Sequence, residues 1–220
     1  MRMRFKPYAR PELLACDFHV HEPLTHGGHW HELYARPGQP WHLELGCGKG
    51  GFLAQIAPAH PDINYLGIDI TDKVLILAKR KVEAAYAARG IPADNVKIAS
   101  LDIERLGNAF TPEDRVSRIY INFCNPWSKN AGSNKHRLTH PRQLLQYRQL
   151  MDEGAEIWFK TDNDPLFAFS LEQFEQEGWE LREVTHDLHA NGPVGVMTDY
   201  EAKFYDQGIT INPVSYTHLR

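Results

Sequence analysis

A glycine-rich segment between residues 44 and 51 has the composition and spacing of a cofactor-binding loop. Gly46, Gly48 and Gly51 satisfy the pattern G-x-G-x-x-G directly after a short apolar run. Glycines at this spacing allow a tight turn after a strand and let a bound cofactor approach the backbone closely. A phosphate-binding P-loop is excluded, because Lys49 is followed by Gly50, where a P-loop has Ser or Thr. The pattern alone fits either a nicotinamide dinucleotide or S-adenosylmethionine.

Three acidic residues discriminate between these cofactors. Asp69 ends the next predicted strand, where a carboxylate would bind the ribose of either one. Glu44 lies two residues before the first glycine, where its carboxylate would attract the α-amino group of S-adenosylmethionine and repel a pyrophosphate. Asp102 follows the third predicted strand and could accept a hydrogen bond from the adenine amino group. The acids therefore favour S-adenosylmethionine, and an NAD-dependent oxidoreductase is the first alternative.

Two more polar residues extend this series to five. Like the three acids, Asn125 and Asp162 fall at or just past the carboxyl end of a predicted strand. Ligands bind at this edge of an open α/β sheet. Each residue alone could be a helix cap or a loop residue, whereas five in succession favour a binding site.

An unusual loop follows the fourth predicted strand. Asn125, Pro126 and Trp127 partly match the Asn-Pro-Pro-Tyr loop of amino-group methyltransferases, which hold a flipped base by hydrogen bonds and stacking. The second proline is absent, and Trp127 could also be a core aromatic residue. A second alternative is therefore an amino-group methyltransferase that acts on another base or on a protein.

Two segments of the chain are basic and free of acids. Residues 115–151 contain seven Lys and Arg but no Asp or Glu, and the first ten residues contain four basic residues and no acid. Such segments can be solvated faces, but their positions beside the candidate site and in the N-terminal arm favour contact with phosphates. The expected N-terminal contacts are Arg2, Arg4 and Lys6. The net charge of −4 therefore does not exclude a nucleic acid partner.

The composition is typical of a soluble globular protein. Of the 220 residues, 42% are hydrophobic and 24% are charged, which argues against a disordered chain, a coiled coil or a disulfide-stabilised mini-protein. The three cysteines are far apart, so neither a disulfide framework nor a metal site is expected. No apolar run approaches the roughly 20 residues of a membrane span, and no signal peptide is visible. We therefore expect a cytoplasmic protein that binds no membrane and no metal.

Strands and helices must position these residues, and they alternate from residue 41 onward. Predicted strands cover residues 42–45, 63–68, 96–99, 116–122 and 155–160, and predicted helices cover 52–59, 72–89, a segment from about 141, and 165–177. Residues 179–187 and 203–212 are predicted to be closing, antiparallel strands. This order predicts an α/β fold whose mostly parallel sheet has helices on both faces. The expected parts are an irregular basic N-terminal arm with one short helix (residues 1–40), a single domain (residues 41–212), and a non-native or disordered tail (residues 213–220).

The order of these motifs resembles that of the bacterial tRNA (guanine-N7)-methyltransferases over nearly the full length of the chain. The matching segments are residues 1–7, 44–50, 122–127, 137–139, 159–163 and 198–201. The resemblance implies a Rossmann-like class I methyltransferase fold, with S-adenosylmethionine as cofactor. It also implies methylation of guanine N7 at position 46, in the variable loop of tRNA. A non-catalytic RNA-binding relative is the third alternative, and we expect a monomer or a homodimer.

The resemblance also implies roles for individual residues. The cofactor-binding residues would be Glu44, Gly46, Gly48, Asp69, Asp102 and Asn125. The substrate-binding residues would be Lys129, Asp162, Thr198, Tyr200 and Glu201, and the loop that contacts RNA would contain Lys135, His136 and Arg137. Asn125 and Asp162 would be catalytic, although the family usually has Asp where this chain has Asn125. Residues 130–134 form a longer and less basic loop than the family's.

Overall fold

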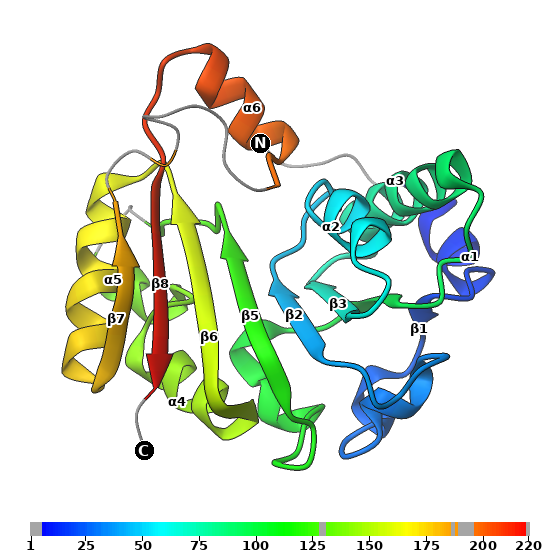
Figure 1. The fold of residues 1–220 in the computed structure, drawn as a ribbon, viewed down its shortest axis with the longest axis horizontal. Helices are drawn as coiled ribbons and strands as arrows, with labels where there is room; N and C mark the ends of the chain where they lie inside the picture. The colour runs from blue at the N-terminus through cyan, green and yellow to red at the C-terminus, as the bar shows by residue number, and fades with distance from the viewer. Residues whose placement is uncertain (1–5, 128–130, 186–187, 189–195, 219–220) are drawn as a thin grey trace. The chain divides into compact units, whose positions relative to one another are not determined.

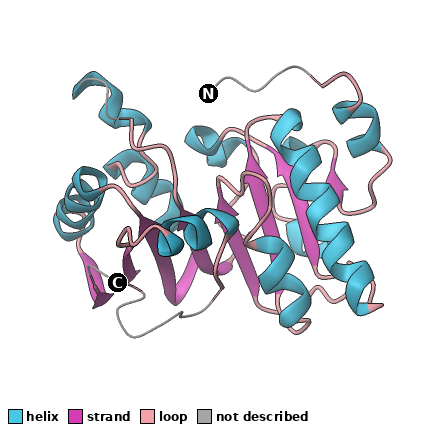
Figure 2. Ribbon diagram, turned by 90° about the horizontal axis from the view of Figure 1, so that it is seen from above, coloured by secondary structure: helices cyan, strands magenta, loops and turns pink. Residues whose placement is uncertain are grey.

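Two compact units, residues 1–114 and 115–220, make up the fold, and strands alternate with helices in each (Figure 1). The computed structural model describes residues 6–127, 131–185, 188 and 196–218. Figure 2, viewed from above, shows helices lying against the strands of each unit. The predicted α/β class is thereby confirmed.

The first unit contains four parallel strands in the order β1-β4-β3-β2. Its strands are β1 (His19–Val20), β2 (Trp41–Leu45), β3 (Asn64–Asp69) and β4 (Val96–Ser100). Its helices are α1 (Ala9–Leu14), α2 (Leu53–Ala59) and α3 (Asp72–Arg89), with short 3-10 helices η1 (Pro23–Thr25), η2 (Trp30–Leu33) and η3 (Ile103–Asn108). The strands and helices predicted between residues 41 and 100 are confirmed. The predicted irregular arm is corrected at β1, which pairs with β4.

Burial and one glycine explain how the helices of this unit approach its strands. All five residues of β2 are buried, as expected for a parallel strand that is covered on both faces. Gly67 in β3 leaves room for α2, because a Cβ atom at this position would overlap the side chain of Leu53. Helix α3 ends at Gly90, whose φ of 65° lies in the left-handed region that favours glycine.

The second unit has the strand order β5-β6-β8-β7. Strands β5 (Val116–Asn122) and β6 (Met151–Thr161) are parallel, whereas β8 (Asn212–His218) is antiparallel to β6 and to β7 (Trp179–Val184). The helices are α4 (Pro141–Leu150), α5 (Asp164–Gln176) and α6 (Asp199–Asp206), with the 3-10 helix η4 (Ala131–His136). The closing strand predicted over residues 179–187 is present as β7, and it is antiparallel to β8.

The predicted strand over residues 203–212 is wrong. Helix α6 ends at Asp206, and the closing strand β8 begins at Asn212. A capping box starts the helix: Oγ1 of Thr198 accepts a hydrogen bond from the N–H of Glu201 at 3.1 Å, and the Glu201 carboxylate accepts one from the N–H of Thr198 at 3.2 Å. The predicted disorder of residues 213–220 is also wrong for residues 213–218, because they pair with β6 and β7.

A buried asparagine fixes the end of α2 beside β4. Asn95 is 1% exposed, and its Nδ2 donates to the carbonyl oxygens of Ala57, His60 and Ile63 at 3.0, 3.1 and 2.8 Å. The first two oxygens belong to the C-terminal turn of α2, where carbonyl groups have no partner within the helix. The Oδ1 atom of Asn95 accepts a hydrogen bond from the hydroxyl of Tyr86 on α3.

We expect Asn95→Ala to lower the free energy of unfolding by about 2–4 kcal/mol, because it leaves several buried polar groups without partners. Urea unfolding of the full chain measures this difference. Asn108→Ala is the matched control, since Asn108 is exposed, and it is expected to change stability by less than about 0.5 kcal/mol. Equal unfolding midpoints for the two variants would contradict the assigned role of Asn95.

Candidate functional site

The glycine loop after β2 is a left-handed turn fixed to the end of β3. Gly46 and Gly48 have φ angles of 78° and 54°. The N–H groups of Gly46 and Cys47 both donate to the carbonyl oxygen of Ile68 at 2.9 Å. A Cβ atom on Gly46 would meet no protein atom within 4 Å, so the space over this turn is open to a ligand.

Gly50 has a different role from the other glycines of the loop. A Cβ atom on Gly50 would lie 2.7 Å from the Cα atom of Ala78, so only glycine allows α3 to pack against the loop. Its φ of 73° also requires glycine. The pattern G-x-G-x-x-G assigns its third position to Gly51, so the pattern alone did not identify Gly50.

Asp69 joins the glycine loop to the turn after β3. Its Oδ2 accepts a hydrogen bond from the N–H of Gly48 at 3.2 Å, and its Oδ1 accepts one from the N–H of Thr71 at 3.3 Å. Burial raises the pKa of Asp69, while these two hydrogen bonds oppose the rise. A carboxylate has about four acceptor positions, so Asp69 can also bind the two hydroxyls of a ribose.

A second carboxylate gives this region negative potential. Glu44 lies in β2 and is 3% exposed. The thiol of Cys47 has a pKa well above its usual value, first because it is buried and then because the charges of Glu44 and Asp69 act on it. Both carboxylates therefore lie near the turn, where a cationic group of a ligand would be stabilised.

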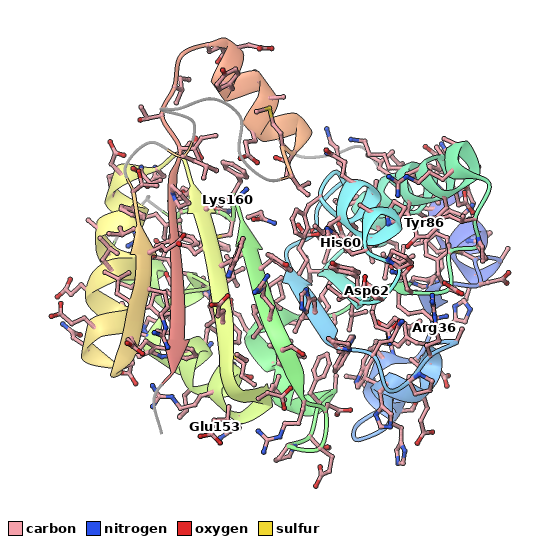
Figure 3. The ribbon with its side chains drawn as sticks, viewed as in Figure 1. Arg36, His60, Asp62, Tyr86, Glu153 and Lys160 are labelled. Carbon is pink, nitrogen blue, oxygen red and sulfur yellow. The ribbon has the colours of Figure 1, made fainter. Side chains whose placement is uncertain are left out.

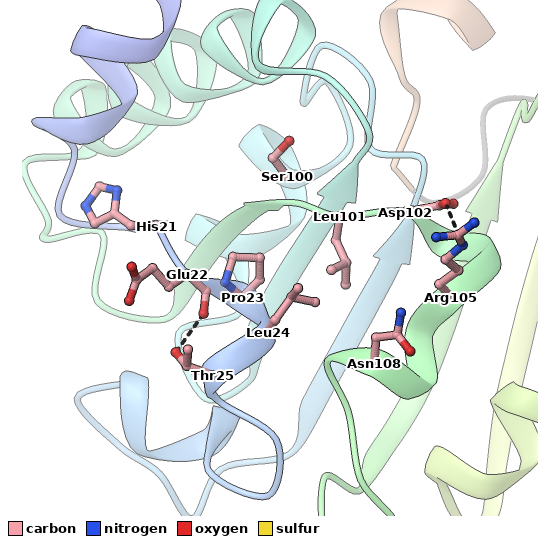
Figure 4. A pocket seen from close by; sticks show the side chains of 10 residues that line it. All are labelled: His21, Glu22, Pro23, Leu24, Thr25, Ser100, Leu101, Asp102, Arg105 and Asn108. Carbon is pink, nitrogen blue, oxygen red and sulfur yellow. Dashed lines mark hydrogen bonds and ion pairs between the residues drawn. The ribbon is translucent and has the colours of Figure 1, made fainter.

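Asp102 lies at a cavity beyond the carboxyl end of β4. The cavity has a volume of about 560 Å³, and Figure 4 shows Asp102 and Arg105 at one end of it, with His21 and Glu22 at the other. Oδ1 of Asp102 accepts a hydrogen bond from the N–H of Glu104 at 3.0 Å, which caps η3. Asp102 thus is a helix cap, and its 43% exposed side chain also faces a space that can hold a ligand.

In the second unit, residues 123–127 form a strained loop after β5, which we call the 123–127 loop. Phe123 and Trp127 have φ angles of 51° and 48°, which are unfavourable for bulky residues and cost about 1–3 kcal/mol each. The N–H of Phe123 donates to the carbonyl oxygen of Lys160 at 2.9 Å, and the N–H of Trp127 donates to Oδ1 of Asn125 at 3.0 Å. Asn125 therefore stabilises the turn through its side-chain oxygen.

Arg137 is largely buried within the second unit. The residue is 8% exposed, its Nε donates to the carbonyl oxygen of Pro126 at 2.9 Å, and its guanidinium lies 4.4 Å from the ring centre of Phe169. A contact of this side chain with RNA stays a prediction. Of its predicted neighbours, Lys135 is exposed, and the His136 ring lies 5.0 Å from the ring of Trp127.

Asp162 directly follows β6 and is partly exposed. Its neighbours have structural roles: Thr161 accepts a hydrogen bond from the N–H of Asn163, and Asn163 caps α5 by accepting one from the N–H of Leu166. Within the described part of the chain, no hydrogen bond or ion pair is made by the side chain of Asp162.

Thr198 and Glu201 contribute to the start of α6 and to a buried ion pair. Glu201 is 0% exposed, and Nζ of Lys160 lies 3.3 Å from its Oε1. Lys160 was not predicted as a site residue, although it belongs to the segment 159–163 that resembles the family. The predicted residues Arg2, Arg4 and Lys129 lie outside the described residues, as does the side chain of Tyr200.

Comparison with known proteins assigns the chain to a family. Residues 38–214 match a family model described as "Putative methyltransferase". The chain is 49% identical to the tRNA (guanine-N(7)-)-methyltransferase of Clostridium perfringens (strain SM101 / Type A) and 50% identical to that of Clostridium beijerinckii, with 96% of both chains covered in each case. The chain belongs to the tRNA (guanine-N7)-methyltransferase family. The predicted membership is confirmed, and the cofactor of this family is S-adenosylmethionine.

Solved structures of other methyltransferases share the fold. The 16S rRNA methyltransferase KamB aligns with a TM-score of 0.60 and 13% identity over 99% of this chain and 96% of that chain. The aminoglycoside resistance methyltransferase NpmB1 aligns with a TM-score of 0.57 and 16% identity over 90% of this chain and 91% of that chain. At these identities the likeness concerns the fold alone, and it confirms the predicted class I methyltransferase fold.

Asp69→Asn is expected to weaken the binding of S-adenosylhomocysteine about 10- to 100-fold, the effect of losing a hydrogen bond to a charged group. Isothermal titration calorimetry measures the dissociation constant. Asp62→Asn is the matched control, because Asp62 is exposed and precedes β3, and its dissociation constant should equal that of the unmodified protein. If both variants bind equally well, Asp69 does not hold the cofactor.

Proposed function

We propose that this protein transfers a methyl group from S-adenosylmethionine to N7 of the guanine at position 46, in the variable loop of tRNA. The observation that carries the proposal is the 49% identity to the Clostridium perfringens enzyme over 96% of both chains. The position within tRNA rests on the resemblance of the sequence motifs. In the described residues, no group of His, Cys, Asp or Glu could hold a metal ion, and no helix is long and apolar enough to span a membrane.

The first unit offers groups that suit each part of the cofactor. The open left-handed turn at Gly46 and Gly48 permits close approach to the backbone, and the carboxylate of Glu44 complements an ammonium group. Asp69 would bind the ribose hydroxyls, and Asp102 would accept a hydrogen bond from the adenine amino group. Nicotinamide dinucleotides fit less well, because the buried carboxylates would repel a pyrophosphate.

The reaction requires positioning more than proton transfer. S-adenosylmethionine supplies a methyl group attached to a positively charged sulfur. Guanine N7 carries an in-plane lone pair and loses no proton when it attacks, so the protein needs no general base. Alignment of the two reactants alone can lower the barrier by roughly 7–11 kcal/mol.

The second unit provides candidate contacts for the guanine. Asp162 would accept hydrogen bonds from N1–H and the 2-amino group, and its negative charge would stabilise the positive charge that develops on the purine. Both oxygens of Glu201 are already held by Lys160 and Thr198. We therefore assign the guanine contact to Asp162 first, with Glu201 and Thr198 as further candidates.

Asp162→Ala is expected to reduce methyl transfer at least about 100-fold while the fold is retained, because charge stabilisation in the transition state is lost. The assay follows the transfer of labelled methyl groups to unmodified tRNA. Glu153→Ala is the control, because Glu153 and Lys160 lie at opposite ends of β6 (Figure 3). Turnover within a factor of about three of the unmodified rate would overturn the role of Asp162.

Asn125→Asp is expected to remain active, because an aspartate oxygen can accept the same hydrogen bond from the N–H of Trp127. The variant is compared with the unmodified protein in single-turnover methylation. A folded but inactive Asn125→Asp protein would show that the amide itself is required.

Mapping the methylated atom tests the proposed function directly. The protein is incubated with labelled S-adenosylmethionine and unmodified tRNA, and the nucleosides are then separated. We expect 7-methylguanosine from position 46. Methylation of an exocyclic amino group would instead identify an amino-group methyltransferase, and RNA binding without methyl transfer would identify a non-catalytic relative.

A further inference from the structure

We propose that Arg137 is a positioning residue that holds the 123–127 loop, and with it Asn125, in the conformation that methyl transfer requires. The role in catalysis rests on the proposed function, whereas the contact with the loop does not. The side chain joins the loop to α5 through one hydrogen bond and one ring contact.

The hydrogen bond is made at the centre of the strained loop. Nε of Arg137 donates to the carbonyl oxygen of Pro126, which lies between the two left-handed residues Phe123 and Trp127. Proline has no N–H, so this carbonyl is the only backbone group of Pro126 that can be held by a hydrogen bond. Ser133 adds a second contact by donating to the carbonyl oxygen of Trp127 at 3.0 Å.

The other end of the contact belongs to a rigid part of the second unit. The guanidinium of Arg137 lies over the ring of Phe169 on α5. The residue that follows, Leu138, accepts a hydrogen bond from the hydroxyl of Tyr147 at 2.9 Å. Thr139 and Ser170 are both 0% exposed, and their hydroxyl oxygens are 2.7 Å apart. The segment that carries Arg137 is therefore fixed to α4 and α5 independently of the loop.

Burial distinguishes this arginine from one that contacts phosphates. Arg137 as a residue is 8% exposed, and burial of a guanidinium is costly unless polar and aromatic partners replace the water. Here the Pro126 carbonyl and the Phe169 ring are those partners. Arginine suits this geometry because its planar group can stack and donate at the same time, which lysine and methionine can do only in part.

Cys124 provides a chemical reporter inside the loop. Burial raises the pKa of its thiol to about 12, so little reactive thiolate forms at neutral pH. The positive charge of Arg137 and the negative charge of Asp162 both act on this thiol, so both groups lie near it. Cys124 is partly exposed in the folded loop. Release of the loop would expose it further and bring its pKa toward the ordinary value, which raises its reactivity with a disulfide reagent.

The test compares Arg137→Met, which can still cover Phe169 but cannot donate, with Arg137→Lys, which retains a donor and the charge. For Arg137→Met we expect kcat to fall about 100-fold with KM for tRNA and for S-adenosylmethionine within about threefold of the unmodified values. Labelling of the Cys124 thiol should accelerate, because a more exposed thiol forms more thiolate at neutral pH. Arg137→Lys should recover part of kcat and slow the labelling.

Arg142→Met is the matched control for the loss of one positive charge. Arg142 is exposed on α4 and belongs to the same acid-free segment, so its replacement should affect KM for tRNA at most and leave the labelling of Cys124 unchanged. The Cys124→Ser variant identifies the reacting thiol among the three cysteines, because Cys16 and Cys47 are buried. Circular dichroism and urea unfolding verify that each variant is folded.

Two outcomes would overturn the proposal. One is a folded Arg137→Met protein with an increased KM for tRNA, an unchanged kcat and unchanged labelling, which would identify an RNA contact. The other is normal kcat and labelling in both Arg137 variants. If the unmodified protein forms no 7-methylguanosine, the proposed function fails, but the labelling experiment still tests whether Arg137 holds the loop.

Discussion

The left-handed turn after β2 is the constraint on which the candidate site of the first unit depends. The N–H groups of Gly46 and Cys47 donate to the carbonyl oxygen of Ile68, and the N–H of Gly48 donates to the side chain of Asp69. The carboxyl end of β3 thus holds the loop that follows β2. Gly50 then allows α3 to pack against it. Asp69 has a double role, because the carboxylate that fixes the turn is also the one placed to bind a ribose. A change that removes its charge should therefore affect the shape of the turn and the affinity for the cofactor together.

The second unit also has a left-handed loop after a strand, but its left-handed residues are not glycines. Phe123 and Trp127 adopt left-handed conformations that are unfavourable for residues with a Cβ atom, so other contacts must fix the loop between them. These contacts come from Asn125 within the loop and from Lys160 and Arg137 outside it. Trp127 is 39% exposed, so its indole ring is accessible at the surface, whereas a glycine at this position would have no side chain. The side chains that make the turn costly are aromatic, and aromatic rings are suited to stacking.

Much of the fold could be predicted because parallel strands leave a strong pattern. Short apolar runs with an acid or an amide at or just past their carboxyl end marked β2 to β6, and Gly90 marked the end of α3. The two-residue strand β1 leaves no such pattern, since its pairing with β4 depends on distant residues. The capping box between Thr198 and Glu201 marks the start of α6, where the sequence analysis predicted a strand from residue 203. Likewise, Arg137 has the residue type of an RNA contact, and its contact with Phe169 on α5 joins residues far apart in the sequence.

The structure also changes the interpretation of the acid-free segment 115–151. The composition of this segment favoured contact with phosphates, but several of its basic residues are engaged within the second unit. Arg118 pairs with Glu156 at 2.9 Å and lies over the ring of Trp158 at 4.3 Å. Arg148 lies over Trp179 and Arg137 is buried. Fewer cations are thus available to RNA than the composition suggests. Since each phosphate contact adds to the salt dependence of binding, a segment whose arginines mainly stabilise the protein should give a shallower dependence than its seven basic residues imply.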